Sequence, residues 1–378
     1  MTEKMSCPFC GTRVEYAVEN SPDWYRDPSL PVYRIDCHDK CRQYWLEAIS
    51  DPHPQIDPAI LAFLDPLNDE QRTYISESTR HACDNGISIV YNSKILQHLI
   101  IDWHYAKAAA KLYEFNDVSF QISGIGFDFA KMLFFLHTAD ARFTLRIYRA
   151  ETPVHKIQSE IYWLQALWNK ARIKTLSPVR GSDGEIIQYP SPSDLPPRYA
   201  TVYNWIPGET LHTLLEVEKT PELIRRLGST VGRMHHVSET LEFPQWFTRP
   251  RYDKDWINKK IEASLGSDTN ASTKELAKLS ALSSHFSQFV TAQGEGRDVF
   301  GLIHSDLEPH NIIIMDGQPC PIDVVEFGFG YYISDILTLS RHFSEDEQAI
   351  FFDGYQEIRP LPTNYRQQLA LFEELRVL

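Results

Sequence analysis

Segments with strand character and segments with helical character occupy different parts of this chain, and this separation limits its fold more than any other feature. Three strand-like segments, 117–126, 131–140 and 141–150, follow one another with Gly and Asp at their boundaries. Because these residues favour tight turns, the segments are expected to pair as an antiparallel meander. Apolar residues at helical spacing follow in 155–171, and a further strand is expected at 198–206.

Helices dominate the chain beyond Pro207 and Gly208, a pair that predicts a hinge. Thr220 and Pro221 form a helix start signal, because Thr can cap the helix and Pro suits its first position. Two short apolar runs, GLIHSD and NIIIMDGQPCPIDVV, are expected to be buried strands that flank a loop. Since strands and helices do not alternate regularly, an α+β fold is favoured over a doubly wound one. The helices expected are about 93–113, 220–237, 256–265 and 272–293, and one more hairpin is expected at 177–190.

Four parts are expected along the 378 residues. Residues 1–50 form a cysteine-rich module, and 51–94 form a connector that starts with a Pro- and Asp-rich stretch holding at most one short helix. Residues 95–206 form a lobe built on the sheet, and 207–378 form a larger helical lobe. A content of 43% hydrophobic residues is enough for a sizeable core in each packed unit.

The formal net charge of -14 argues against nucleic acid as the main partner, because neutralising its phosphates needs clustered Lys and Arg. This charge leaves room for a cationic substrate. The sequence has no run of about 18 apolar residues, and the N-terminus lacks the apolar core of a secretory signal. We therefore expect a cytoplasmic protein without a membrane partner, whose six cysteines are thiols or metal ligands rather than disulfides.

Polar residues that suit phosphoryl transfer are densest in HSDLEPHN, residues 304–311, and Asp323 follows twelve residues later. Phosphoryl transfer needs a carboxylate that orients the attacking hydroxyl and accepts its proton, and it needs oxygen ligands for Mg²⁺. Asp306 suits the first role, whereas Asn311 and Asp323 suit the second. Each of them could instead cap a turn, as Asp and Asn do in most loops. Their occurrence together at this spacing favours the catalytic interpretation.

HSDLEPHN resembles the H-x-D-x-x-x-x-N motif of the aminoglycoside phosphotransferase and choline kinase group, which shares the bilobal fold of protein kinases. The resemblance covers residues 95–378, where ARFTLRIYRA, SEIYWLQAL, LGSTVGRMHHV, GFGYYISDIL and FFDGYQEIRPLP occur in that family's order. It implies ATP and Mg²⁺ as cofactors, Asp306 as catalytic base, and metal binding by Asn311 and Asp323. It also implies that His304 and Asp335 support the catalytic loop.

The resemblance further implies a nucleotide site, with one departure from the family's pattern. Arg146 stands where the family often carries a phosphate-binding lysine, and a guanidinium can hold phosphate oxygens at two points. Glu160 would then pair with Arg146 and fix it over the phosphates. The alternatives are a solvated strand residue at Arg146 and an ordinary surface helix residue at Glu160.

Two further features are expected to contact ATP. Gly124 and Gly126 would let the backbone approach the phosphates, because glycine has no side chain, although a GxG is also common in plain turns. Adenine is expected at the hinge, against backbone groups of Tyr203, Asn204 and Trp205. The alternative for Trp205 is a simple core residue.

Acidic and aromatic residues near the catalytic loop are the candidates for the acceptor side. Glu308 and Glu326 would suit a small-molecule alcohol that bears an amine, since carboxylates pair with cations and aromatic faces attract them. The alternative is a solvated acidic surface. An aminoglycoside, an amino alcohol, a sugar and a protein Ser or Thr stay open as acceptors. The remaining candidates are Asp255, Trp246, Phe247, Tyr252 and Trp256.

The N-terminal cysteines predict a structural Zn²⁺ site. Cys7 and Cys10 have the spacing of a zinc knuckle, and Cys37 with Cys41 would supply the second half-site. His38 could replace Cys37, because the second pair is one residue longer than usual. The arrangement resembles treble-clef zinc fingers, and the alternative is unligated buried thiols. Such a module would contact a protein partner or dock on the kinase domain.

Two other functions compete with a small-molecule kinase. A protein Ser/Thr kinase of the same fold is disfavoured because Val324 and Val325, rather than Phe and Gly, follow Asp323. A pseudokinase adaptor is disfavoured because a scaffold has no need for Asp306, Asn311 and Asp323 together.

Overall fold

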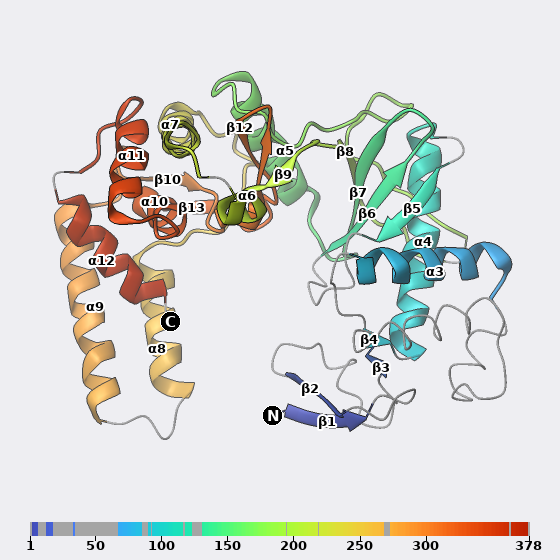
Figure 1. The fold of residues 1–378 in the computed structure, drawn as a ribbon, viewed down its shortest axis with the longest axis horizontal. Helices are drawn as coiled ribbons and strands as arrows, with labels where there is room; N and C mark the ends of the chain where they lie inside the picture. The colour runs from blue at the N-terminus through green and yellow to red at the C-terminus, as the bar shows by residue number, and fades with distance from the viewer. Residues whose placement is uncertain are drawn as a thin grey trace. The chain divides into compact units, whose positions relative to one another are not determined.

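A computed structural model shows how the predicted segments are arranged (Figure 1). Two compact units divide the chain: the first comprises Met1–Thr152 with Pro178–Trp205, and the second comprises Pro153–Ser177 with Ile206–Leu378. The residues that the structure describes are 2–6, 13–17, 33–34, 67–84, 90–91, 93–115, 118–122, 131–193, 195–217, 219–267, 273–362 and 364–376.

A four-stranded antiparallel sheet forms the centre of the first unit. Its order is β5-β6-β7-β8, so the predicted meander is confirmed. Leu145 and Ile147 of β7 are fully buried, because side chains two residues apart on a strand lie on the same face of the sheet and pack together there. The strands are β5 (Ser119–Ile122), β6 (Lys131–His137), β7 (Arg142–Tyr148) and β8 (Ala200–Asn204).

Helices α3 (Asp69–Asp84) and α4 (Ser93–Leu112) pack beside this sheet, near β5 and β7 respectively. The helix α4 was predicted, but α3 is longer than the short helix expected in the connector. Asn68 and Gln71 explain where α3 starts: the amide of Gln71 donates to the side chain of Asn68 at 2.9 Å, and the amide of Asn68 donates to that of Gln71 at 3.1 Å. This reciprocal capping box is readable in the letters NDEQ.

Two shorter pairings and one loop complete the first unit. Strands β1 (Thr2–Ser6) and β2 (Arg13–Ala17) pair antiparallel, as do β3 (Tyr33–Arg34) and β4 (Val90–Tyr91). The hairpin expected at 177–190 is instead a loop that touches β8 through single bridges, Pro178 to Tyr203 and Gln188 to Ala200. Its backbone turns at Gly184, where φ is 83°.

The second unit is mostly helical, as predicted, and three short antiparallel strand pairings lie within it. Strand β10 pairs with β13, and β11 pairs with both β12 and β9. The predicted buried strands on both sides of the loop at 304–311 are therefore confirmed. The strands are β9 (Glu209–Thr210), β10 (Phe300–Ile303), β11 (Ile312–Met315), β12 (Gln318–Pro321) and β13 (Gly328–Tyr331). The helices are α5 (Val154–Asn169), α6 (Leu211–Val217), α7 (Pro221–Thr240), α8 (Lys254–Ser267), α9 (Thr273–Gln293), α10 (Tyr332–Ser340), α11 (Glu345–Gln356) and α12 (Tyr365–Arg376).

The core of the second unit is organised around α7. Thr220 caps this helix by accepting from the amide of Leu223 at 3.2 Å, as its start signal predicted. Helix α11 packs closely against α7 because glycines face the contact: a Cβ on Gly228 would collide with the carbonyl oxygen of Phe351, and one on Gly354 with that of Arg225. This packing carries α7 under β10 and brings His235 beneath the catalytic loop.

Several predicted residues lie outside the described part of the chain, so the predictions for them stay predictions. They are Cys7, Cys10, Cys37, His38 and Cys41 of the zinc module, and Gly124 and Gly126 of the phosphate-binding turn. None of the helices in the described ranges combines the length and apolarity needed to cross a bilayer.

Candidate active site

A buried carboxylate fixes the start of the catalytic loop. Asp335, in the first turn of α10, accepts from the backbone amides of His304 at 2.7 Å and Ser305 at 2.9 Å. Its side chain is completely buried, so these bonds act in a low-dielectric surrounding. Ser305 adopts φ 68°, a strained value for a residue with a side chain. The bonds to Asp335 hold this conformation and thereby aim Asp306.

A second layer of side chains holds Asp335 in turn. His235 Nε2 lies 3.4 Å from Asp335 Oδ2, and His235 Nδ1 lies 3.1 Å from the hydroxyl of Tyr355. Arg359 donates to the Tyr355 oxygen at 3.0 Å, so the Tyr355 hydroxyl donates to Nδ1 and the Nε2 proton faces Asp335. Burial lowers the pKa of His235 and favours this neutral ring. Burial raises the pKa of Asp335, but hydrogen bonds from the side chain of His235 and the backbone of His304 outweigh that effect and keep this pKa below its usual value.

His304 connects the catalytic loop to the segment that carries Asp323. Its Nε2 lies 2.8 Å from the carbonyl oxygen of Ile322, and the Ile322 amide donates to the carbonyl of Asn311 at 2.9 Å. Asp323 itself adopts φ 55°, a left-handed conformation that Asp tolerates better than most residues. The predicted supporting role of His304 therefore has a geometric basis, because its ring fixes the peptide next to Asp323.

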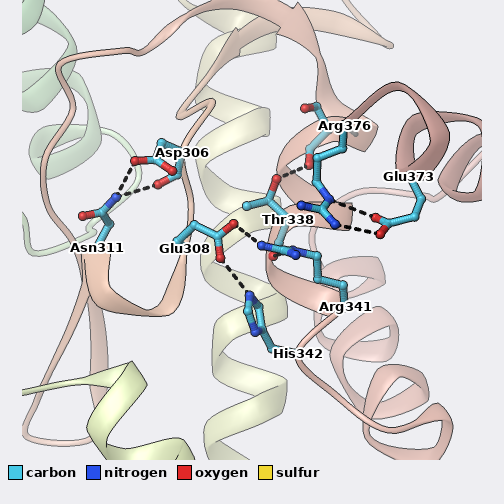
Figure 2. A network of polar contacts seen from close by, with 9 residues as sticks. Asp306, Glu308, Asn311, Thr338, Arg341, His342, Glu373 and Arg376 are labelled. Carbon is cyan, nitrogen blue, oxygen red and sulfur yellow. Dashed lines mark hydrogen bonds and ion pairs between the residues drawn. The ribbon is translucent and has the colours of Figure 1, made fainter. Parts of the chain in front are cut away.

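Asp306 and Asn311 are joined directly. The amide nitrogen Nδ2 of Asn311 donates to the Asp306 backbone oxygen at 2.9 Å and to its carboxylate oxygen Oδ2 at 2.8 Å (Figure 2). This contact orients the carboxylate of Asp306, and it turns the carbonyl oxygen of the Asn311 side chain away from Asp306. Together with the Ile322 to Asn311 bond, it brings the three residues predicted from the motif into one neighbourhood.

The segment after Asp323 is held at three consecutive carbonyls. Arg249 donates to the carbonyls of Val325 and Phe327, the latter at 2.9 Å, and its guanidinium carbon lies 3.7 Å from the Phe327 ring centroid. The carbonyl of Glu326 between them accepts from the hydroxyls of Tyr252 and Ser305, both at 2.6 Å. These contacts fix Asp323 and Glu326 relative to the catalytic loop.

A pocket of about 350 Å³ opens beside Asp306, entirely within the second unit. Its floor is apolar and comes from β10, β13 and the helices α8, α10 and α12. The apolar and aromatic lining consists of Tyr252, Trp256, Ile257, Ile303, Gly330, Tyr331, Leu337, Phe372 and Leu375. The polar lining consists of Lys260, Ser305, Asp306, Glu326, Ser334, Thr338 and Arg376.

The predicted acceptor residues separate into two groups. Glu326 lines the pocket together with Asp306, and Tyr252 and Trp256 lie in its wall. Glu308 is not part of the lining: Arg341 binds one of its carboxylate oxygens, and His342 Nε2 lies 2.8 Å from the other (Figure 2). Asp255, Trp246 and Phe247 are also absent from the lining.

Sequence reasoning missed the contribution of the C-terminal helix. Phe372, Leu375 and Arg376 of α12 line the pocket although they lie more than sixty residues after Asp306. Their spacing predicts one helix face, but nothing in the letters indicates which element that face meets.

The predicted nucleotide residues lie in both units. Arg146 on β7 is only 3% exposed, and its guanidinium carbon lies 5.6 Å from the ring centroid of Tyr203. Glu160 on α5 is also 3% exposed, so neither residue is the solvated surface residue that was the alternative. Their pairing would join the two units and stays a prediction. Trp205 contacts Phe135 edge to face, with ring centroids 5.2 Å apart.

Comparison with known proteins identifies the group to which this arrangement belongs. The model of the phosphotransferase enzyme family matches residues 121–369, which is more than half of the chain. The chain belongs to this phosphotransferase enzyme family. It is an ATP-dependent phosphotransferase that acts on hydroxyl acceptors, as the motif and its resemblance predicted.

Solved structures with the same kinase-like α+β fold agree with this assignment. A microcompartment-associated aminopropanol kinase is 22% identical with a TM-score of 0.55, over 72% of this chain and 86% of that one. An amicoumacin kinase in complex with AMP-PNP, Ca²⁺ and Ami is 20% identical with a TM-score of 0.57, over 74% and 86%. An aminoglycoside phosphotransferase, APH(2'')-IIia, in complex with GDP and kanamycin is 16% identical with a TM-score of 0.54, over 72% and 90%. A search of curated protein sequences gives no significant match.

Proposed function

We propose that this phosphotransferase moves the γ-phosphoryl group of ATP to the hydroxyl of a small amine-bearing molecule, with Asp306 as the catalytic base. One observation carries this proposal: Asp306 lines a pocket of about 350 Å³ while Asn311 holds its carboxylate at 2.8 Å. A carboxylate that is oriented from one side and open to a ligand-sized space on the other can receive a hydroxyl.

Asp306 would act as the hydroxyl attacks. The hydroxyl donates to the Asp306 carboxylate, which fixes the direction of its oxygen. As the new bond from this oxygen to phosphorus forms and the bond to ADP breaks, the proton passes to Asp306 and later to solvent. Asp335 and His304 keep the loop in place through the contacts described above.

Asn311 and Asp323 fit a Mg²⁺ site. Both offer hard oxygen atoms, and Mg²⁺ in kinases takes only one or two carboxylates beside phosphate oxygens and water. When bound, the ion would neutralise charge that develops on the phosphates. Among the described residues, no group of three or more His, Cys, Asp or Glu side chains is placed to hold a metal ion.

The nucleotide would lie against residues of both units. We propose that Arg146, fixed by Glu160, holds phosphate oxygens, and that Gly124 and Gly126 let the backbone approach them. Backbone groups of Tyr203, Asn204 and Trp205 would hold the adenine. The bounds 95–206 and 207–378 for the two lobes belong to the same proposal.

The N-terminal module is proposed to hold one structural Zn²⁺. Cys7 and Cys10 would bind it together with Cys41 and either Cys37 or His38, and residues 51–94 would connect this module to the kinase domain. Metal analysis of the purified protein tests this, with about one zinc per chain expected. Removal of the zinc should then unfold the module, and a zinc-free protein with an intact N-terminus would exclude the site.

Transfer to a panel of acceptors tests the proposed function. The protein is incubated with ATP and Mg²⁺ and with an amino alcohol, an aminoglycoside, a sugar or a Ser-containing peptide, and each acceptor is weighed for an added phosphoryl group. An aminopropanol kinase shares this fold, which supports testing amino alcohols first. Modification of the peptide alone would favour a protein kinase. Nucleotide binding without transfer to any acceptor would favour the adaptor.

A further inference from the structure

The acceptor pocket has a chemistry that narrows the substrate class, provided that the proposed function holds. We infer that the acceptor is a monocationic alcohol with an apolar body, and that this body rests against Trp256 and the face of α12 while the ammonium group lies at Glu326.

The charges of the pocket do not suit a polycation. Among the described residues that line it, two are acidic, Asp306 and Glu326, and two are basic, Lys260 and Arg376, and Arg376 is already paired with Glu373, which lies outside the lining. Asp306 is needed at the reacting hydroxyl. Glu326 is therefore the carboxylate of this lining that can meet an ammonium group, and a single ammonium suffices for it.

Two further carboxylates near the pocket are already paired. Glu308 lies between Arg341 and His342, and Glu373 receives both ends of the Arg376 guanidinium, at 3.0 and 3.2 Å (Figure 2). Recruiting either one to a substrate amine would break an existing ion pair. A substrate with several ammonium groups would thus find one suitable carboxylate in this lining, Glu326, and its further ammonium groups would lie near the positive charge of Lys260, where like charges repel.

The lining offers instead an apolar surface for the body of the acceptor. Leu337 from α10 and Phe372 and Leu375 from α12 lie on its floor, and Trp256 from α8 lies in its wall. Trp256 is 40% exposed, with the Lys260 ammonium 5.2 Å from its ring centroid, so part of its apolar surface is open to water. A bound apolar group would remove this surface from water and gain affinity in proportion to the area covered.

Tyr252 connects the apolar wall of the pocket to the backbone of Glu326. Its ring contacts Trp256 edge to face, with centroids 5.0 Å apart, and its hydroxyl donates to the carbonyl oxygen of Glu326 at 2.6 Å. Both partners are thus held by one aromatic side chain. The pocket volume, about 350 Å³, lies near the lower end of the range for small-molecule sites and fits one ring with a short polar arm better than several linked sugars.

Calorimetry tests this inference by measuring the affinity of acceptor ligands for the protein saturated with Mg²⁺ and AMP-PNP. Three ligands are compared: 1-aminopropan-2-ol, 2-amino-1-phenylethanol, which exchanges its methyl group for a phenyl ring, and the polycation kanamycin. We expect the phenyl compound to bind about tenfold or more tightly than the methyl compound, because burial of a ring is worth at least that much. Kanamycin should bind more weakly than the phenyl compound.

Two substitutions locate the effect. Trp256→Ala should remove most of the phenyl advantage while the affinity for 1-aminopropan-2-ol stays within about twofold. Trp246→Ala is the matched control, since Trp246 is 45% exposed and does not line the pocket. Glu326→Gln should weaken 2-amino-1-phenylethanol by about threefold, the effect of an exposed ion pair, and should leave 1-phenylethanol, which has no amine, unchanged.

The outcomes separate this inference from the proposed function. Tighter binding of kanamycin than of the phenyl compound, or a phenyl advantage that persists in Trp256→Ala, overturns the inference. Phosphoryl transfer is measured separately with wild type and Asp306→Asn. If transfer depends on Asp306 but the affinities contradict the inference, the proposed function stands and only the substrate class is wrong. If no transfer depends on Asp306, the proposed function itself falls.

Discussion

Replacing Asp335 with alanine should destabilise the second unit and stop the reaction, although Asp335 does not line the acceptor pocket. The carboxylate accepts two backbone amides, from His304 and Ser305, at 2.7 and 2.9 Å, and faces His235 at 3.4 Å. Hydrogen bonds to a charged group contribute about 1.5–3 kcal/mol each, so the two short ones amount to roughly 3–6 kcal/mol. Removal of one partner of a buried charged pair typically costs about 3–5 kcal/mol, which agrees.

Thermal unfolding measures this loss. For a domain of about 150–250 residues, each kcal/mol lowers the unfolding temperature by about 2–4 °C, so a fall of roughly 6–20 °C is expected. The unfolding temperature of Asp335→Asn should fall by less, because one of the two backbone amides keeps an oxygen acceptor while the other meets the NH₂ group of the new side chain. Tyr355→Phe, which removes the hydroxyl bonded to His235, should lose only about 1 kcal/mol.

The kinetic result completes this test. Because Asp335 holds Ser305 at φ 68°, its loss should let the backbone relax and misplace Asp306. We expect kcat for phosphoryl transfer to fall by about a hundredfold or more, since small misplacements of a reacting group have effects of that size. An Asp335→Ala protein that unfolds within about 2 °C of wild type and keeps kcat within a few-fold would refute the reasoning.

Three further results are expected. Asp306→Ala should abolish transfer while ATP affinity stays within a few-fold, whereas Asp323→Ala should weaken binding of the metal–nucleotide complex. Calorimetry with AMP-PNP and varied Mg²⁺ measures the nucleotide affinity of each variant. Equal affinities in both variants would contradict the assignment of roles. Burial lowers the pKa of His235 below its ordinary value of 6.5, so the folded protein binds fewer protons there than the unfolded one, and its contribution to stability is present above pH 6.5 and lost as the pH falls below it. Unfolding temperatures between about pH 8 and 5 should show this loss, and His235→Asn should flatten that part of the curve. Arg249→Lys should lower kcat by about tenfold, because an ammonium lacks the planar fork with which the guanidinium reaches two carbonyls and covers the Phe327 ring. Arg225→Lys, whose side chain pairs with the exposed carboxylates of Asp353 and Glu357, is the control and should change kcat by less than about twofold.

The order of elements could be read from the sequence with few errors. Strand patterns bounded by Gly and Asp predicted the meander, and Thr220 with Pro221 predicted where α7 begins. Helix α3 was not predicted at its full length, although it has a readable capping box at Asn68 and Gln71. The prediction of a hairpin at 177–190 was wrong, because glycines and prolines indicate a turn but do not show whether the residues on both sides of it pair as strands.

In the active site, too, contacts within one segment could be predicted from the sequence and contacts between distant segments could not. Spacing within one segment predicted that Asp306 and Asn311 act together, because eight residues between two strands cannot place them far apart. Glu308, only two residues from Asp306, could not be assigned in this way, since its partners Arg341 and His342 come from the end of α10. The anchors Asp335, His235 and Arg249 also lie far from this loop in the sequence, the first after it and the other two before it, and only packing reveals which carbonyls and amides they reach.

By itself, the sequence determined the chemistry of this protein: local spacing fixes the carboxylates and the amide, and local patterns fix the helices and strands around them. The tertiary structure decided which side chains surround Asp306. The pocket beside it is built by α8, α10, α12 and two strands that meet only after folding, and its apolar lining depends on that meeting. The physical reason is the separation in sequence of the residues involved. Turns and helices depend on neighbours a few residues apart, whereas a pocket depends on side chains from distant segments that burial brings together.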